Sequence, residues 1–418
     1  MRNKKILLIT YYWPPAGGSG VQRWLYFANN LAEMGYDVSV ITSKSKNYQL
    51  FDQELENYVS SKIKVIKISS FEPAKFFKSN NSNSDNINSD GLFNKIKLFI
   101  RANFFFPDSR KFWINKVVKT AIKYINSNEI DYLITSSPPF SLNIIGYKIK
   151  SKTNIKWISD CRDPWSDFFQ FRIMPMSNYI FNKHLKWEEI CLKSADSVIV
   201  TSPSLRNAYS KVNSNTYLIN NGFEKYNEVN NSGLFNIVYS GVMKSSQNPI
   251  MLWKVLADLC KSTESFKNDL KIKLIGDFDS SIFKNKNIIE LEKKVCFIGY
   301  TSKLNLNTHL CESSVFLLCD INDSNGGNLI PGKFYDYLSY KIPIIAFSNK
   351  NSDTYNIVKE TNSGNVFDFS NEFDLKNHIL ELYSNFKNNK LILSKNNSNK
   401  YLISNLTLEL NKLLKKLI

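Results

Sequence analysis

Short apolar runs alternate with amphipathic segments along this chain. The first run, residues 6–10, is continuous and bounded by charge, which is typical of a strand buried on both faces of a parallel sheet. A glycine-rich turn at 16–20 and an amphipathic segment at 21–34 follow, and residues 38–42 form the next apolar run. Strand, glycine turn, helix and strand in this order predict a βαβ unit.

The same alternation continues through most of the chain. Further strands are predicted at residues 65–68, 132–136, 156–159, 197–201, 216–219, 235–240, 271–276, 295–297, 315–319 and 343–347. Amphipathic segments lie between many of these runs, so the pattern predicts an α/β chain whose parallel sheets are covered by helices.

The length of the chain predicts two domains. A chain of 418 residues exceeds what one core usually supports, and we expect two doubly wound, Rossmann-like domains. We place the first at residues 1–222, a polar linker at 223–233 and the second at 234–398. Residues 78–90 are polar and of low complexity, which predicts a flexible insertion. The amphipathic helix at 399–418 either crosses back to the first domain or lies on the second.

Composition is typical of a cytoplasmic globular protein. The apolar fraction is 43%, no window is long enough to span a bilayer, and the first apolar run is too short for a signal peptide. The six cysteines lack CxxC spacing and are expected as buried thiols in a reducing compartment. The three histidines are unpaired, so we expect neither a metal site nor a resident cofactor.

The formal net charge of +17 suggests an anionic partner. Nucleic acid has little support, because the cations are spread along the chain without a nucleic-acid-binding motif. Between Phe93 and Tyr124, however, basic and aromatic residues interleave. This run fits a surface held at an anionic membrane, or a core-packing helix with a solvated basic face. Both alternatives stay open, as does the oligomeric state.

The segment 328–347 carries the clearest candidate chemistry. A glycine-rich loop runs into Gly332 and Lys333, a short helix follows, and a proline precedes an apolar strand. A helix start with a lysine suits a diphosphate, because the backbone N–H groups and the ammonium are both positive. One turn further, the carboxylate of Asp336 can accept hydrogen bonds from both hydroxyls of a ribose. An ordinary loop, helix and strand without a ligand is the alternative.

The glycines near the N-terminus are spaced GGxG, not GxGxxG, which argues against a dinucleotide-binding dehydrogenase. The chain carries instead an ordered series of motifs: PPAGGSGVQR, PDSRKFW, TSSPPFS, WISDCRDPW, NNGFE, YSGVM, LIGDF, FIGYTS and PGKFYDYL. In this order they resemble the retaining glycosyltransferases of GT-B fold, family-4 type, which build surface polysaccharides. The resemblance covers nearly the whole chain.

The resemblance implies two domains that face each other across a cleft. It implies a nucleotide-diphosphate sugar as co-substrate, held by the second domain, and a glycan or lipid-linked acceptor at the first. On the family mechanism the leaving phosphate can take the acceptor's proton, so the protein acts by positioning and electrostatics. We therefore expect a cytoplasmic hexosyltransferase, with peripheral attachment to the inner face of the cell membrane as an option.

The resemblance also implies particular site residues. The donor diphosphate would lie among Gly17, Gly18, Lys244, Gly332 and Lys333. The ribose and donor sugar would lie at Gly327, Asn328 and Asp336. Two departures concern the donor site. Relatives have two glutamates, for the donor sugar and the ribose, where this chain has Asn328 and Asp336, and they often have an arginine for the diphosphate where it has Val242 and Met243. Lys244 is then the nearest cation.

Four residues of the first domain complete the candidate site. Asp160 follows a strand where many relatives carry a histidine, and its carboxylate is expected to contact a donor hydroxyl or steady charge at the anomeric carbon. Asp163 is either functional or a structural ion pair with Arg162. Asp108 borders the acceptor side or caps a turn, and Trp113 is expected on the acceptor side.

Two other functions share this architecture. A non-hydrolysing sugar-nucleotide epimerase would need acid and base side chains in the cleft, for which a histidine-poor chain offers little. An inactive nucleotide-binding scaffold would fit Asn328 and the missing arginine.

Overall fold

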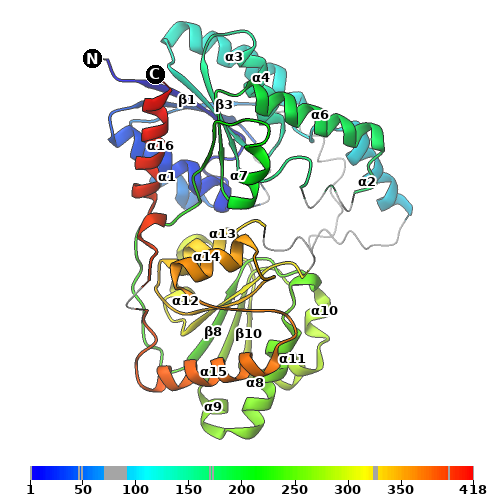
Figure 1. The fold of residues 1–418 in the computed structure, drawn as a ribbon, viewed down its shortest axis with the longest axis vertical. Coiled ribbons are helices and arrows are strands. Elements are labelled where there is room, and N and C mark those ends of the chain that lie inside the picture. Colours follow the sequence, from blue (N-terminus) through cyan, green and yellow to red (C-terminus); the bar gives the residue numbers. More distant parts are fainter. Residues whose placement is uncertain are drawn as a thin grey trace. The chain divides into compact units, whose positions relative to one another are not determined.

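The computed structural model describes residues 2–45, 48, 50–69, 92–168, 171, 174–322, 328–393 and 396–417. The chain forms two compact units, the first made of Met1–Asn220 with Leu406–Ile418 and the second of Asn221–Asn405 (Figure 1). The boundary expected from sequence lay at residue 222. The predicted flexible insertion at 78–90 lies outside the described residues.

The first unit contains a parallel seven-stranded sheet of order β3-β2-β1-β4-β5-β6-β7. Its strands are β1 Lys5–Thr10, β2 Asp37–Ser43, β3 Lys64–Ile68, β4 Tyr132–Ser137, β5 Lys156–Cys161, β6 Ser197–Val200 and β7 Thr216–Leu218. The order reverses between β1 and β4, so the carboxyl ends of these two strands flank the switch point at which such sheets bind ligands.

Helices surround this sheet. They are α1 Ser19–Glu33, α2 Leu92–Phe104, α3 Lys111–Asn128, α4 Ser141–Lys150, α6 Asn178–Ser194, α7 Pro203–Tyr209 and α16 Ile403–Lys416. Figure 1 shows α16, in red, beside α1, in blue. Hydrogen bonds join α16 to the first unit, among them those from Tyr132 Oη to the Leu414 carbonyl (3.0 Å), from Tyr36 Oη to Asn411 Oδ1 (2.7 Å) and from Asn30 Nδ2 to Thr407 Oγ1 (3.2 Å).

The second unit contains a parallel six-stranded sheet of order β10-β9-β8-β11-β12-β13. Its strands are β8 Phe235–Ser240, β9 Leu270–Ile275, β10 Val295–Ile298, β11 Val315–Cys319, β12 Ile344–Phe347 and β13 Gly364–Phe367. Its helices are α8 Ile250–Ser262, α9 Glu264–Asp269, α10 Ser280–Phe283, α11 Lys286–Glu290, α12 Lys303–Leu310, α13 Gly332–Leu338, α14 Asp353–Thr361 and α15 Glu372–Lys387. The switch point lies between β8 and β11.

The predicted α/β fold with two doubly wound sheets is confirmed. One strand escaped prediction: β13 is only four residues long, begins with Gly364 and contains Asn365, so it has no apolar run that marks a buried strand. It lies at the edge of its sheet, where pairing with β12 on one side is sufficient.

Candidate functional site

The carboxyl ends of β8 and β11 in the second unit surround a buried lysine. Lys333, on α13, places its Nζ 3.6 Å from the centre of the Tyr239 ring. Among the described residues, this ammonium has no hydrogen-bond partner although the atom is buried. Burial lowers the pKa of Lys333 to about 7, against the opposing effect of Cys319 and Asp320. A buried cation with unmet hydrogen-bonding capacity suits an anionic ligand.

Glycine at position 241 leaves room for this ammonium. Gly241 follows β8 with φ of 107°, a backbone conformation that favours glycine, and a Cβ there would lie 3.3 Å from Lys333 Nζ. Its own N–H donates to the Ile275 carbonyl at 2.8 Å, so Gly241 contributes space rather than a donor. Because α13 has only seven residues, the positive character of the site rests mainly on Lys333.

Asp320 is an acidic group of this region that sequence analysis missed. It follows β11 directly, is buried, and its Oδ2 accepts a hydrogen bond from Ser348 Oγ at 2.6 Å. Burial raises the pKa of Asp320 to about 6, while Ser348, Thr354 and the charge of Lys333 lower it. An aspartate immediately after the apolar run 315–319 was the available signal, since strand ends carry ligand-binding residues in such sheets.

Asp336 lies one turn after Lys333 and is paired. Its Oδ1 is 2.5 Å from the ammonium of Lys303, the first residue of α12. The helix beneath it is fixed, because the ring of Tyr337 stacks on Phe316 (4.3 Å, 2° between planes) and Tyr337 Oη accepts the Ser240 N–H at 2.9 Å. Sequence analysis did not single out Lys303.

Four other residues of the second unit are predicted from the sequence to bind the nucleotide sugar. Gly332 opens α13 next to Lys333. Asn328 and Lys244 are both exposed, and Lys244 follows Gly241 by three positions. Gly327 lies outside the described residues.

The glycines around the start of α1 make local contacts. The N–H of Gly17 donates to the Leu50 carbonyl at 3.0 Å and is therefore not available to a diphosphate here. Gly18 precedes α1 and accepts the N–H of Val21 at 3.0 Å. Gly20 lies against Arg162, since a Cβ there would be 1.9 Å from Arg162 Nη1.

Asp160 forms a buried ion pair. Arg23 Nη2 lies 2.9 Å from Asp160 Oδ1, and Asp160 Oδ2 accepts hydrogen bonds from Trp24 Nε1 and Ser136 Oγ, each at 2.6 Å. Both charged side chains are almost completely buried, because α1 covers the end of β5. The expected contact between Asp160 and a donor sugar is absent from this arrangement, since neither oxygen reaches the surface.

Asp163, three residues further, has a different environment. It forms neither a hydrogen bond nor an ion pair with any residue in the described ranges. Its neighbour Arg162 turns away, donating to the carbonyls of Ser137 (Nε, 3.2 Å) and Pro138 (Nη2, 2.7 Å). Burial raises the pKa of Asp163, and Arg162 partly offsets that effect. The expected structural ion pair is therefore not formed, and Asp163 keeps both oxygens for another partner.

The loop that carries Asp163 is anchored by Glu188, which sequence analysis also missed. The Glu188 carboxylate accepts the N–H groups of Trp165 (3.0 Å) and Ser166 (3.1 Å) and the hydroxyl of Tyr209. Trp165 Nε1 in turn donates to His184 Nδ1 at 2.9 Å. A histidine and a glutamate four residues apart on one helical face were the available signal.

Asp108 and Trp113 are structural. Asp108 Oδ1 accepts the N–H of Arg110 and Oδ2 that of Ser141, both at 2.8 Å, so it caps α4 and the turn before α3, and burial raises its pKa. Trp113 is fully buried, donates to the Ile68 carbonyl at 3.2 Å and packs edge-on against Tyr11. The expectation that Trp113 contacts an acceptor is wrong, because no part of its side chain is exposed.

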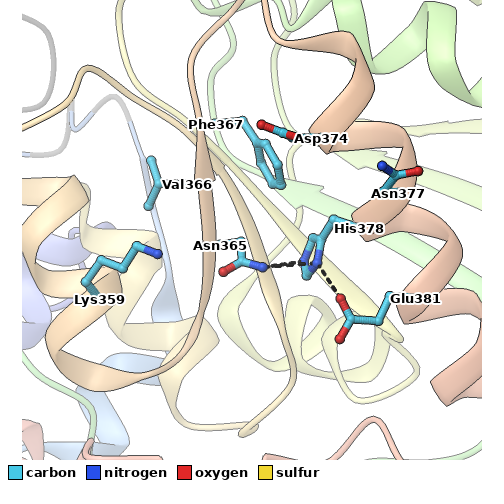
Figure 2. A pocket seen from close by; sticks show the side chains of 8 residues that line it. All are labelled: Lys359, Asn365, Val366, Phe367, Asp374, Asn377, His378 and Glu381. Atoms are coloured by element: carbon cyan, nitrogen blue, oxygen red, sulfur yellow. Dashed lines mark hydrogen bonds and ion pairs between the residues drawn. The ribbon is translucent and has the colours of Figure 1, made fainter.

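A separate pocket of about 350 Å³ lies beside the edge strand β13. Figure 2 shows His378 between Asn365 and Glu381, with Nδ1 of His378 3.0 Å from Asn365 Nδ2 and 3.2 Å from Glu381 Oε2. It contains none of the predicted site residues, and three of its polar side chains, Asn365, His378 and Glu381, contact one another.

Residues 223–399, all within the second unit, match the family described as "Glycosyl transferases group 1". No curated protein sequence matches the chain. The second unit thus carries a glycosyltransferase group 1 domain.

Solved structures match nearly the whole chain. Sucrose-phosphate synthase from Thermosynechococcus elongatus is 14% identical with a TM-score of 0.63, covering 99% of both chains. TarM from S. aureus, in complex with fondaparinux, α-GlcNAc-glycerol and UDP, is 13% identical with a TM-score of 0.61, covering 98% of this chain and 99% of its own. A putative UDP-N-acetylglucosamine 2-epimerase from Listeria monocytogenes is 10% identical with a TM-score of 0.59, covering 99% and 96%.

At these identities the likeness shows the fold alone, which is GT-B, as predicted. The match of residues 223–399 to a glycosyltransferase family is the finding that supports sugar transfer.

We expect a large loss of stability when the Arg23 side chain is replaced by an uncharged one. Arg23→Met leaves the Asp160 carboxylate buried without its counter-charge and removes a donor to the Asn220 carbonyl (2.8 Å), which should lower the free energy of unfolding by about 3–5 kcal/mol. Urea unfolding followed by tryptophan fluorescence measures this. Lys62→Met, at the exposed Lys62–Glu33 pair, is the matched control and should change little. Equal effects of the two variants would contradict the structural role.

Lys333 predicts a stability that rises with pH. The pKa of an unfolded lysine is near 10.5, whereas that of buried Lys333 is about 7, so folding releases a proton between these values. Below pH 7 both states are protonated and the cost of burying the charge is fully present. Relative to Lys333→Met, the wild type should therefore gain stability as pH rises from about 7 to about 10 in urea titrations. If the difference in unfolding free energy between the wild type and Lys333→Met did not change with pH, Lys333 would have the same pKa in the folded and unfolded states.

Proposed function

We propose that this chain, whose second unit carries a glycosyltransferase group 1 domain, is a retaining hexosyltransferase. It would move a sugar from a nucleotide-diphosphate sugar to a glycan or lipid-linked acceptor in the synthesis of cell-surface polysaccharide. The observation that carries the proposal is the buried ammonium of Lys333, unpartnered among the described residues, at the ligand-binding end of the domain that matches the family.

In this proposal the protein stabilises the departing diphosphate. Charge develops on the phosphate as the bond to the anomeric carbon breaks, and a cation already in place in a site of low polarity lowers that barrier. Lys333 would supply this charge from the start of α13, and exposed Lys244 would supply it from the loop after β8. Asp336 would hold the ribose, and Asn328, with Gly327, a donor-sugar hydroxyl. The proton of the acceptor would leave on the phosphate.

Asp163 is the candidate for the reacting sugar in the first unit. Its carboxylate is partly buried and has no partner in the described part of the chain, as a group that meets a substrate would require. A negative charge there would steady the positive charge that grows on the anomeric carbon. Asp160 would act behind it, through its ion pair with Arg23.

Two alternatives have support of their own. The similarity to the Listeria epimerase favours a sugar-nucleotide epimerase, and exposed Asn328 in place of the usual glutamate favours an inactive scaffold. Incubation with a panel of nucleotide sugars without acceptor separates them. Slow release of free sugar and nucleoside diphosphate supports the transferase, formation of an epimer supports the epimerase, and binding without either product supports the inactive scaffold.

Lys333→Ala should weaken binding of UDP by about 1.5–3 kcal/mol, the range for a charge-assisted hydrogen bond. Isothermal titration calorimetry measures this at pH 6.5, where Lys333 is mostly protonated. Lys293→Ala, an exposed lysine of the same unit, is the control. Unchanged affinity in Lys333→Ala would remove this residue from the diphosphate site.

Asp336→Asn should weaken UDP binding by roughly 1.5–3 kcal/mol and leave pyrophosphate binding nearly intact, because only the nucleotide carries a ribose. Calorimetry with both ligands tests it. An equal loss for both would mean that Asp336 supports α13 instead of contacting the ribose.

For the acceptor side we propose a membrane face on the first unit, formed by exposed apolar residues of three helices. They are Ile96, Phe99 and Phe104 of α2, Phe112 of α3 and Tyr179 of α6. Phe104 is 64% and Tyr179 75% exposed. Asn103 joins α2 to the start of α6, donating to the Pro175 carbonyl and accepting the Ser177 N–H, both at 2.9 Å.

The charge around the membrane face is strongly positive. Residues 92–128 contain eight lysines and arginines and a single acid, Asp108, which is half-buried and accepts two backbone N–H groups. Lys183 of α6 adds a cation over the Phe106 ring at 4.5 Å. No helix within the described ranges is long and apolar enough to cross a bilayer. Aromatic side chains at the interface with cations on lipid phosphates would give reversible attachment at the cytoplasmic surface.

The membrane face predicts salt-sensitive binding to anionic vesicles. The protein should sediment with phosphatidylserine-containing vesicles at low salt, stay in solution with neutral vesicles, and be released by a few hundred millimolar salt. Replacing Lys95 and Arg101 by Glu should abolish sedimentation without changing UDP binding. Lys284→Glu with Lys293→Glu, in the second unit, is the charge-matched control. Equal sedimentation with anionic and neutral vesicles would contradict the proposal.

A further inference from the structure

We infer that Lys303 is a positioning residue for the Asp336 carboxylate and thereby makes the donor site selective for ribonucleotides over 2′-deoxyribonucleotides. The inference rests on the proposed function, since it extends the ribose site to a residue of a neighbouring helix. Its basis is the contact of 2.5 Å between Lys303 Nζ and Asp336 Oδ1, which joins α12 to α13.

The contact is more than an incidental surface pair. The side chains of Lys303 and Asp336 are 24% and 29% exposed, whereas the exposed pair Lys62–Glu33 in the first unit has values of 57% and 64%. Tyr340, two residues after the end of α13, also donates from Oη to Asn307 Oδ1 of α12 at 3.4 Å. Leu310 of α12 belongs to the apolar cluster that contains Phe334 of α13, so packing helps to hold the helix that carries Lys303.

Asp336 needs such a partner to bind a diol well. The backbone of α13 is fixed by Tyr337, which stacks on Phe316 and accepts the Ser240 N–H. A fixed helix backbone does not fix the plane of the Asp336 carboxylate, because the terminal torsion of aspartate has a broad, two-fold distribution. A salt bridge to Oδ1 restricts that rotation, so both oxygens can be presented together to two ribose hydroxyls.

Selectivity follows from this geometry. A 2′-deoxyribose offers one hydroxyl, and it leaves one hydrogen bond of the oriented carboxylate unmade. An Asp336 carboxylate without Lys303 can turn to serve a single hydroxyl, so loss of Lys303 should weaken UDP more than 2′-deoxy-UDP. The effect appears in a ratio of affinities, which a general loss of stability in the second unit would not change.

The experiment is calorimetric titration of the full chain with UDP, 2′-deoxy-UDP and pyrophosphate. We expect the wild type to prefer UDP by about tenfold, the size of one hydrogen bond to a charged group, and Lys303→Met to reduce this preference several-fold with pyrophosphate binding unchanged. Lys303→Arg keeps the positive charge and should retain most of the preference for UDP over 2′-deoxy-UDP. Lys284→Met is the control for loss of an exposed lysine.

Coupling to Asp336 gives the second readout. In Asp336→Asn the preference is already small, so adding Lys303→Met should cause no further change. An unchanged ratio in Lys303→Met, or a further loss in the double variant, would overturn the inference while UDP binding by the wild type still supported the proposed function. If UDP and GDP both failed to bind the wild type, the proposed function would fail and the inference with it.

Discussion

A buried ammonium with unmet hydrogen-bonding capacity is the constraint around which the second unit is arranged. Lys333 lies over the face of Tyr239, which offers a favourable quadrupole but no hydrogen bond. Gly241 leaves the space above it, and Asp320 provides a distant counter-charge held by Ser348. These neighbours make the charge tolerable without neutralising it, so the site retains a strong preference for an anion.

The first unit handles its buried charge in the opposite way. Arg23 and Asp160 satisfy each other, and Trp24, Ser136 and the carbonyls of residues 219 and 220 complete their hydrogen bonds. Such a saturated pair holds α1 against the end of β5 and offers nothing to a ligand. Asp163, the carboxylate that we propose for the reacting sugar, lies instead on a loop that Glu188 anchors through two backbone N–H groups.

In the ribose site that we propose, a departure from the family pattern at position 336 is met by a residue from another helix. Aspartate at 336 is one methylene shorter than the glutamate of relatives, so its carboxylate stays close to α13. At that position it contacts Lys303 of α12, which would fix the orientation of the Asp336 carboxylate. A glutamate has a longer side chain and would extend further from α13. The residue that compensates is 33 positions away in the chain, in a helix whose polar pattern looks ordinary.

By itself the sequence determined the fold class and the placement of the chemistry along the chain. Strand periodicity and motif order predicted two doubly wound sheets, and the lysine at 333 was recognised from its neighbours in sequence, because strand and helix starts are local features. The tertiary structure decided which charges are free to act. Whether Asp160, Asp163 or Trp113 meets a ligand depends on what α1, α6 and β1 place over each of them, and burial and ion pairing between residues more than a hundred positions apart leave no local pattern to read.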